Sequence, residues 1–358
     1  METVLHYIIR AVTSSLFATS ILGLTSSIQT NTTASTNQNI KLLTPIEYRI
    51  NTTSQYSLIN PLIYIDTDQR LYPEYNYFDT QINTYVSNEE KINQVNSVSV
   101  YLRDMNSGHW TGTNENDLYE PGSMLKVAML IAYERYAMDQ ATLNKTTVQD
   151  VLSQQLYYPG ANELGQYYKS SNPDLQPGSY SIQTLLDRMI IDSDNTALEV
   201  LMKNQQDYFN SVYSDFRLPP SPTAQDGDFM TAESYSVIFR SLFNGTYLNR
   251  SASNATLQLL TKTTFNDGLV AGLPTLTPPL TVAHKFGERT YELANGIVES
   301  HELHDCGIIY YPGHPYLLCV MTKGNSDYPF LAHVISDISK MAYQFVSTEY
   351  PATTTSSH

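Results

Sequence analysis

The helix predicted over residues 123–138 limits the fold more than any other part of this sequence. Apart from Lys126, every position from 124 to 132 is apolar: Met124, Leu125, Val127, Ala128, Met129, Leu130, Ile131 and Ala132. An α-helix turns once every 3.6 residues, so this run leaves no polar face. A helix that is apolar on every side is buried on every side. We therefore expect other elements of a large domain to surround it.

The elements predicted around this helix follow the order strands, helices, strands, helix. A helix at 79–95 precedes a strand at 97–102, where polar and apolar residues mostly alternate, and a second strand begins at Trp110. Helices are predicted at 148–156, 181–191, 196–203, 231–243 and 254–260, strands at 281–286, 294–300, 306–311 and 316–322, and a last helix at 329–347. This order indicates an α+β fold, in which one antiparallel sheet is flanked by helices and an all-helical subdomain, about 127–262, is inserted between its strands. A ligand would bind between sheet and subdomain, next to Ser123.

Three short motifs occur in a fixed order: Ser123-Met-Leu-Lys126, then Ser193-Asp-Asn195, then Lys285-Phe-Gly287. Lys126 is the one lysine with a serine three residues upstream, a spacing that places both on one helix face. A serine hydroxyl attacks carbonyl groups well only when a neighbouring base removes its proton. The start of a helix also favours the negative charge that forms on the oxygen. The motifs therefore predict serine acyl transfer, with Ser123 as the nucleophile.

Together these motifs resemble those of the penicillin-interacting serine hydrolases, most closely the class A β-lactamases. The likeness continues through 177–197 and 304–324 and covers roughly residues 76–348. The resemblance implies the β-lactamase/transpeptidase-like fold and an acyl-enzyme formed on Ser123 by a β-lactam or a D-Ala-type peptide. Two other functions stay open: a D,D-peptidase or transpeptidase acting on peptidoglycan, and a catalytically silent peptidoglycan-binding module.

The resemblance also implies a role for each motif residue. Lys126 acts as a neutral base, and Ser193 relays a proton to the leaving nitrogen. Substrate is bound by Asn195, Lys285, Gly287 and Glu288, with the backbone N–H groups of Ser123 and Glu288 as oxyanion donors. Simpler readings remain for single motifs: Ser123 as a helix N-cap, Ser193 or Asp194 as the cap of a helix starting at Thr196, and Lys285 as an exposed edge lysine.

Two departures from the family pattern affect the expected chemistry. Phe286 stands where the family usually has a Thr or Ser whose hydroxyl helps to bind the substrate carboxylate, and Arg289 or Thr290 would have to compensate. The family's catalytic Glu on the loop before the third motif has no counterpart in 215–228. Asp226 and Asp228 are the nearest candidates for activating water, although Asp228 also suits a cap for the helix at Thr231. An acyl-enzyme is therefore expected to persist.

Composition excludes several other function classes. The formal net charge is −15 and no basic cluster occurs, which argues against nucleic-acid binding. The sequence has neither Cys-x-x-Cys nor His-x-x-x-His spacing, so we expect no zinc or other metal site and no cofactor. We interpret the two cysteines, Cys306 and Cys319, as small buried core residues in preference to a disulfide. We expect a monomer.

The N-terminus predicts export. Arg10 precedes an uncharged, largely apolar run from Ala11 to Leu24, which is short for a membrane span and is followed by a polar stretch. We interpret 1–40 as a signal peptide or short membrane anchor plus linker, 41–75 as an extension packed on the domain, 76–348 as the hydrolase domain and 349–358 as a disordered tail. This predicts an extracytoplasmic protein, secreted, periplasmic or at the cell surface. The alternative is a disordered cytoplasmic tail at 1–40.

Overall fold

The computed structural model describes residues 47–49, 56–65, 73–91, 95–160, 166–170, 172–219, 227–293 and 295–351. The chain divides into two compact units, Met1–Leu42 and Leu43–His358, and every described residue belongs to the second. The predicted signal or anchor at 1–40 and most of the predicted tail lie outside the described residues. Within the described ranges, none of the helices combines the length and the apolar character needed to cross a membrane.

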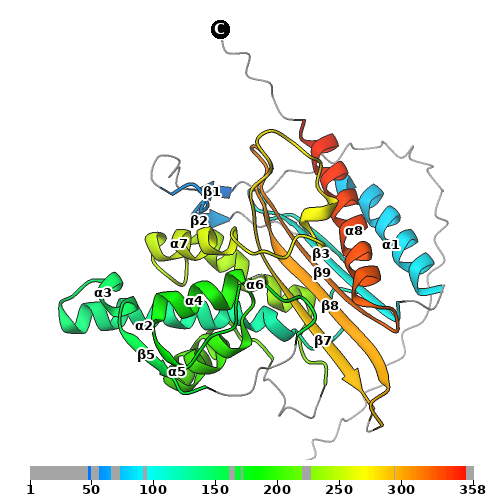
Figure 1. Ribbon diagram of the computed structural model, residues 1–358. Coiled ribbons are helices and arrows are strands. Elements are labelled where there is room, and N and C mark those ends of the chain that lie inside the picture. Colours follow the sequence, from blue (N-terminus) through cyan, green and yellow to red (C-terminus); the bar gives the residue numbers. More distant parts are fainter. Residues whose placement is uncertain are drawn as a thin grey trace, which may run out of the picture. The chain divides into compact units, whose positions relative to one another are not determined.

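One five-stranded antiparallel sheet organises the second unit (Figure 1). Its strands are β3 (Ser97–Asp104), β4 (Trp110–Thr113), β7 (Val282–Glu292), β8 (Val298–Ile309) and β9 (Tyr316–Gly324), in the order β4-β3-β9-β8-β7. The early strand β3 pairs along its whole length with the late strand β9, as predicted. The two strands predicted at 294–300 and 306–311 are wrong, because β8 runs unbroken between them. The buried side chains of Glu302 and His304 hid its apolar pattern.

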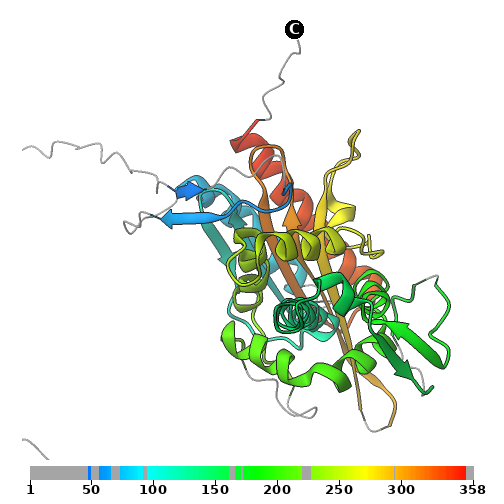
Figure 2. The ribbon, with the colours of Figure 1, turned by 90° about the vertical axis from the view of Figure 1, so that its left-hand side faces the viewer.

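Helices cover both faces of this sheet. On one face α1 (Asn76–Lys91) and α8 (Tyr328–Glu349) pack together against the strands (Figures 1 and 2). On the other face lie α6 (Ala232–Asn244) and α7 (Arg250–Leu260). Side chains alternate along a strand, so β9 contributes Leu318 and Val320 to one apolar core and Leu317 and Met321 to the other. The predicted α+β class is confirmed.

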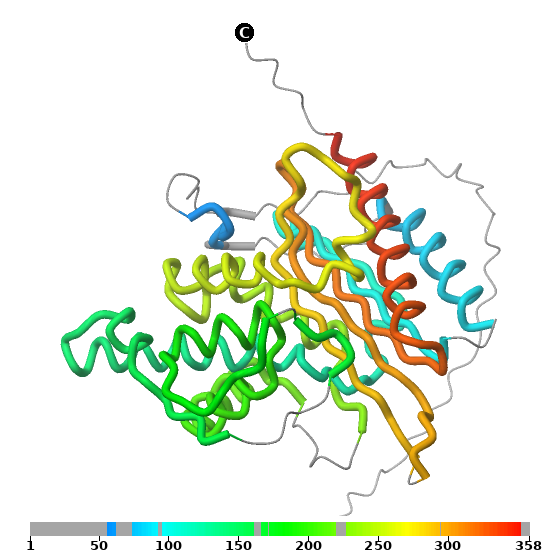
Figure 3. Tube along the Cα trace, in the orientation of Figure 1, coloured from blue at the N-terminus to red at the C-terminus, as the bar shows by residue number. Residues whose placement is uncertain are grey.

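The helix predicted to be buried on every side is α2 (Lys126–Asn144), and each of its residues from Lys126 to Glu134 is buried. It packs against α3 (Val148–Leu152), α4 (Ile182–Ile191), α5 (Asn195–Asp215) and α7, which form the helical subdomain. A short 3-10 helix, η2 (Gly122–Leu125), precedes it. The subdomain is not entirely helical, because β5 (Gln155–Tyr158) and β6 (Gly178–Ser181) form a small antiparallel sheet. Both strands lie in the green part of the chain in Figure 3.

Part of the extension predicted at 41–75 also packs on the domain. Its strands β1 (Glu47–Arg49) and β2 (Leu62–Ile65) pair with each other, and the 3-10 helix η1 (Pro73–Tyr75) leads into α1. Between the strands, Leu58 N–H donates to Asn254 Oδ1 at 3.1 Å, and Asn60 N–H donates to Phe243 O at 2.9 Å. These bonds attach the extension to the helices on one face of the sheet.

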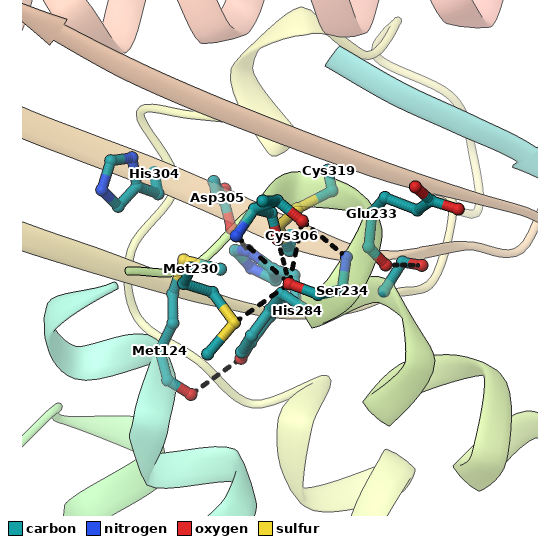
Figure 4. The surroundings of a disulfide bond; sticks show 12 residues. Met124, Met230, Glu233, Ser234, His284, His304, Asp305, Cys306 and Cys319 are labelled. Carbon is teal, nitrogen blue, oxygen red and sulfur yellow. Dashed lines mark hydrogen bonds and ion pairs between the residues drawn. A yellow bond between two sulfur atoms is a disulfide. The ribbon is translucent and has the colours of Figure 1, made fainter. Parts of the chain in front are cut away.

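The prediction of two unpaired cysteines is wrong, because Cys306 and Cys319 form a disulfide (Figure 4). The two residues occupy directly opposite positions on β8 and β9, with their Cα atoms 4.0 Å apart. Both are fully buried, on the face of the sheet that the helical subdomain covers. The sequence pattern places both cysteines on neighbouring strands, but it does not reveal the register, and the register determines whether the two sulfur atoms meet.

Candidate active site

The turn that carries Ser123 lies against the edge of β7, and two glycines allow this approach. Gly122 has a φ of +53°, which L-residues rarely adopt, and a Cβ at this position would lie 2.6 Å from Glu288 O. A Cβ on Gly287 would lie 2.1 Å from Pro121 O. Any larger residue at either position would separate the nucleophile from β7.

Buried side chains hold the peptide groups just before this turn. Glu302 Oε2 accepts from Glu120 N–H at 2.8 Å, and Thr322 N–H donates to His304 Nδ1 at 3.2 Å. His304 Nε2 therefore carries the ring proton and donates it to Glu120 O at 3.1 Å. Burial alone would raise the pKa of Glu302, but the hydrogen bonds from His304 and Lys323 and the charge of Lys323 lower it below its usual value. The start of the turn that carries Ser123 is thus fixed by an ionised, buried carboxylate.

Lys126 contacts Ser123 within a set of four oxygen atoms. Its Nζ lies 2.8 Å from Ser123 Oγ, 2.6 Å from Ser193 O, 3.1 Å from Ser193 Oγ and 2.7 Å from Asn195 Oδ1. The carbonyl of Ser193 and the amide oxygen of Asn195 can only accept hydrogen bonds. A neutral amine has two N–H donors, which these two acceptors occupy. Its lone pair is then left for a hydroxyl proton, and Ser123 Oγ is the closer of the two hydroxyls.

The protonation state of Lys126 fits this arrangement. The side chain is fully buried at the start of α2, and burial lowers its pKa from 10.5 to about 7, against the opposing charges of Asp194 and Glu288. A substantial fraction of Lys126 is therefore neutral at neutral pH. The geometry and the lowered pKa together make Lys126 a competent general base for Ser123.

Ser193 bridges the two lysines of the site. Its Oγ lies 3.1 Å from Lys126 Nζ and accepts from Lys285 Nζ at 2.9 Å. Its backbone has a φ of +54°, an unusual value for a non-glycine residue, which turns the hydroxyl toward both amines. We expected Lys285 to be a cation lining the cleft, but it is fully buried, and burial followed by the charge of Lys126 lowers its pKa well below 10.5.

Asp194 fixes the loop from which Ser193 and Asn195 project. Its Oδ1 accepts from Ala197 N–H at 2.9 Å, which caps α5, and its Oδ2 accepts from Arg188 Nε at 2.8 Å. The simpler reading of Asp194 as a helix cap therefore agrees with the structure. It is compatible with a catalytic role for the loop, because the cap orients the residues on either side of it.

These groups open into a cleft of ≈ 580 Å³. Among the described residues its lining consists of Glu120, Gly122, Ser123, Lys126, Gln166, Tyr167, Asn195, Leu198, Glu288, Arg289, Thr290, Glu292 and Tyr328. The first two motifs thus meet in one cleft, with Ser193 and Lys285 directly behind it.

The free edge of β7 offers a donor for an oxyanion. Thr263 Oγ1 donates to His284 O and Lys285 Nζ donates to Phe286 O, both at 3.1 Å, so these carbonyls point away from β8. Backbone direction alternates along a strand, which gives Glu288 the same outward orientation. A Cβ on Gly122 would lie 3.1 Å from Glu288 N. The N–H of Glu288 therefore faces the turn of Ser123.

A family model described as the beta-lactamase enzyme family matches residues 78–346. This chain belongs to that family. No curated protein matches the sequence significantly. Among solved structures, PBP-A is 18% identical with a TM-score of 0.58, over 76% of this chain and 97% of that one. A point mutant of PBP-A, solved as an acyl-enzyme complex with penicillin G, is 20% identical with a TM-score of 0.59. The match covers 78% of this chain and 100% of that one. A class A β-lactamase representative from Bacteroides cellulosilyticus is 18% identical with a TM-score of 0.60. The match covers 75% of this chain and 98% of that one.

Phe286, the first departure from the family pattern, does not line the cleft. It is buried and stacks on Phe265 with ring centroids 4.3 Å apart, and the edge of Tyr168 packs on it at 5.8 Å. Arg289 and Thr290, suggested as replacements for the missing hydroxyl, do line the cleft. However, Arg289 Nε pairs with Glu120 Oε2 at 3.4 Å, and the hydroxyl of Thr290 bonds to Tyr328 at 2.7 Å.

A segment that the sequence did not predict borders the cleft. We call residues 166–170 the strap. The N–H groups of Tyr167 and Tyr168 donate to the two carboxylate oxygens of Glu288, at 2.6 and 3.2 Å. Burial raises the pKa of Glu288 despite these bonds. The ring of Tyr167 packs on the ring of Tyr328, with their centroids 4.8 Å apart. Main-chain N–H groups occur at nearly every position, so no residue type signals this contact.

Of the two carboxylates considered for water activation, Asp228 does not line the cleft. Asp228 Oδ2 pairs with Lys323 Nζ at 2.7 Å, and its Oδ1 accepts from Tyr291 at 2.9 Å. It does not cap α6, because Thr231 provides that cap. Asp226 lies outside the described residues. Among the described residues, the carboxylates that line the cleft are Glu120, Glu288 and Glu292.

Proposed function

We propose that this member of the beta-lactamase family forms an acyl-enzyme on Ser123 with β-lactams or D-Ala-type peptides and hydrolyses it slowly. The observation that carries the proposal is the contact of 2.8 Å between Ser123 Oγ and Lys126 Nζ, a lysine whose pKa is about 7. At family level the chain is a β-lactamase-like serine hydrolase. The acyl-enzyme that the PBP-A mutant forms with penicillin G supports the same first step here.

In the proposed acylation, Ser123 Oγ attacks the substrate carbonyl while Lys126 Nζ takes its proton. The negative charge that develops on the carbonyl oxygen is stabilised by the N–H groups of Ser123 and Glu288. The carbon–nitrogen bond then breaks, and Ser193 Oγ gives its proton to the leaving nitrogen. Lys126 returns the first proton to Ser193, at 3.1 Å, so that the base is neutral again. Asn195 would orient the substrate amide.

Slow deacylation follows from the carboxylates available. Hydrolysis of the ester needs a base that activates water, and the loop before the third motif lacks the family's Glu. Asp228 is held by Lys323 and Tyr291. Missing water activation also favours the second candidate in its transpeptidase form, because an acyl group that water removes slowly can be transferred to an amine.

Intact mass of the protein mixed with benzylpenicillin, followed over time, tests the proposal. We expect an adduct that persists and is absent in Ser123→Ala. Ser99→Ala serves as a control, because Ser99 is buried, does not line the cleft and bonds to Asn114 and Tyr119. An adduct that vanishes while penicillin is consumed would mean an efficient β-lactamase. The absence of any adduct, with penicillins and D-Ala thioesters alike, would refute acyl transfer and leave the silent binding module.

We also propose an extracytoplasmic site of action. Disulfides persist in oxidising compartments, and the fully buried Cys306–Cys319 bond supports such a location. Fractionation of cells that express the full chain tests this proposal, and recovery of the protein only with cytoplasmic markers would contradict it.

A further inference from the structure

The cleft around Ser123 differs from a site built to hold a carboxylate. Its lining includes three acidic side chains, Glu120, Glu288 and Glu292. The cationic side chains among its described lining residues are Lys126 and Arg289. The charges in the cleft are therefore weighted toward the negative, as is the whole chain with a net charge of −15.

Neither cation is well placed to compensate a carboxylate on a ligand. Lys126 is buried, and its N–H groups bond to oxygens of the protein. Arg289 is half exposed, and its charge is balanced by Glu120, whose other carboxylate oxygen accepts from Gly122 N–H at 3.2 Å. Lys285, expected as a cation of the cleft, is buried behind Ser193.

The strap also occupies space beside β7. Tyr167 and Gln166 border the cleft, whereas Tyr168 and Phe286 border a separate small hollow together with Phe265. The two hollows therefore lie on different sides of the strap. The side chain at 286 is turned away from the reacting serine, and the carboxylate of Glu288 stands on the cleft side.

We infer that the cleft reacts faster with acyl donors whose leaving group carries no negative charge than with donors, penicillins included, whose leaving group is anionic, and this inference rests on the proposed acylation of Ser123. An anionic leaving group would enter a cleft lined by Glu288 and Glu292, and both cations among the described lining residues, Lys126 and Arg289, already have partners in the protein. A neutral or cationic leaving group avoids this repulsion, and Glu292 would attract the cationic one. Ser123 Oγ bonds to the acyl carbon, the bond from that carbon to the leaving atom breaks, and the leaving group departs with one proton.

Two thioesters with the same acyl group test the inference. N-Benzoyl-D-alanyl thioglycolate releases an anionic thiol acid, and the corresponding thioglycolamide releases a neutral thiol. The second-order rate of acylation is measured for each by loss of the thioester absorbance and by intact mass, at low and high salt. We expect the amide to react faster, with a preference that shrinks as salt screens the charges.

Glu292→Gln and Glu299→Gln provide the matched comparison. Both residues are exposed near the same β7–β8 hairpin, and only Glu292 lines the cleft. Glu292→Gln should reduce the preference for the neutral leaving group about threefold, the effect of one charge at close range in water. Glu299→Gln should leave it unchanged.

An anionic substrate that reacts as fast as the amide, or equal effects of the two substitutions, would overturn the inference while acylation still occurs. If neither thioester nor penicillin acylates Ser123, the proposed function fails and the inference fails with it.

Discussion

Replacing Lys126 with methionine should stabilise the folded protein near neutral pH while abolishing acylation of Ser123. The amine is fully buried, and its pKa falls from 10.5 in the unfolded chain to about 7 in the fold. Methionine fills a similar volume without a titratable group. The substitution therefore removes the cost of burying a charge together with the catalytic base.

The magnitude follows from proton linkage. A shift from 10.5 to about 7 corresponds to about 5 kcal/mol of destabilisation when both states are protonated, at about 1.4 kcal/mol per pH unit. Methionine also leaves the buried Ser193 O without its donor, at about 1–3 kcal/mol, whereas Asn195 Oδ1 lines the cleft and can be hydrated. The net gain in the free energy of unfolding should be about 2–4 kcal/mol below pH 7.

The change with pH of the stability difference between the two proteins is a more specific prediction than its size. Between about 7 and 10.5 the unfolded chain keeps the proton on Lys126 and the folded chain has lost it. The unfolded state then binds more protons, so the stability of the wild type rises with pH. The advantage of Lys126→Met should fall by about 1.4 kcal/mol per pH unit between about pH 7.5 and about pH 9.5.

Urea unfolding of both proteins across this pH range measures the difference. Lys262→Met, at an exposed position, controls for the loss of one positive charge. Acylation by penicillin provides an independent readout, because its rate in the wild type should rise about tenfold per unit below pH 7 and level off above it. A stability difference that stays constant over the range would refute the lowered pKa of Lys126, and with it the neutral-base mechanism.

Three further predictions concern single contacts. Gly287→Ala should destabilise the fold by about 1–3 kcal/mol and slow acylation, because its Cβ would collide with Pro121 O. Gly178→Ala is the control for urea unfolding, because the atom nearest to its added Cβ is 3.8 Å away. Equal losses of stability in the two variants would contradict the close approach of Gly287 to Pro121. Glu288→Ala should speed hydrogen exchange of the Tyr167 and Tyr168 amides roughly tenfold, since both lose their acceptor; unchanged exchange would show that this carboxylate does not hold the strap. Replacing both cysteines with alanine should lower the free energy of unfolding by about 3 kcal/mol, because it removes a crosslink between residues 13 apart. An intact mass that shows two free thiols in the wild-type protein would contradict the disulfide.

The parts of the site that the sequence could predict are those fixed by local spacing. Ser123 and Lys126 are one helical turn apart, so any helix through them brings their side chains together. The apolar run after them also made the burial of Lys126 foreseeable, and burial is what lowers its pKa. One local pattern thus predicted both the central helix and the chemistry proposed for its first residues.

Features that depend on strand register or on loop conformation could not be predicted from the sequence. The alternation of a strand assigns a face to each residue, but it does not say which residues stand opposite on the next strand. The disulfide depends on that register, and the unbroken strand β8 was missed because buried Glu302 and His304 interrupt its apolar pattern. The strap depends on main-chain N–H groups that meet the Glu288 carboxylate, and no residue type marks such a meeting in advance.

For Lys285 the sequence predicted the strand on which it lies, but not the burial of its side chain. The sequence located it on a strand at the edge of the cleft, and edge lysines are usually solvated. Ser193, held in a left-handed conformation by its loop, covers the amine and accepts its hydrogen bond at 2.9 Å. A lysine covered in this way loses its hydration, and its pKa falls. In the proposed mechanism it then acts as a donor to the hydroxyl of Ser193, and we infer that Glu288 and Glu292 set the charge that a substrate meets.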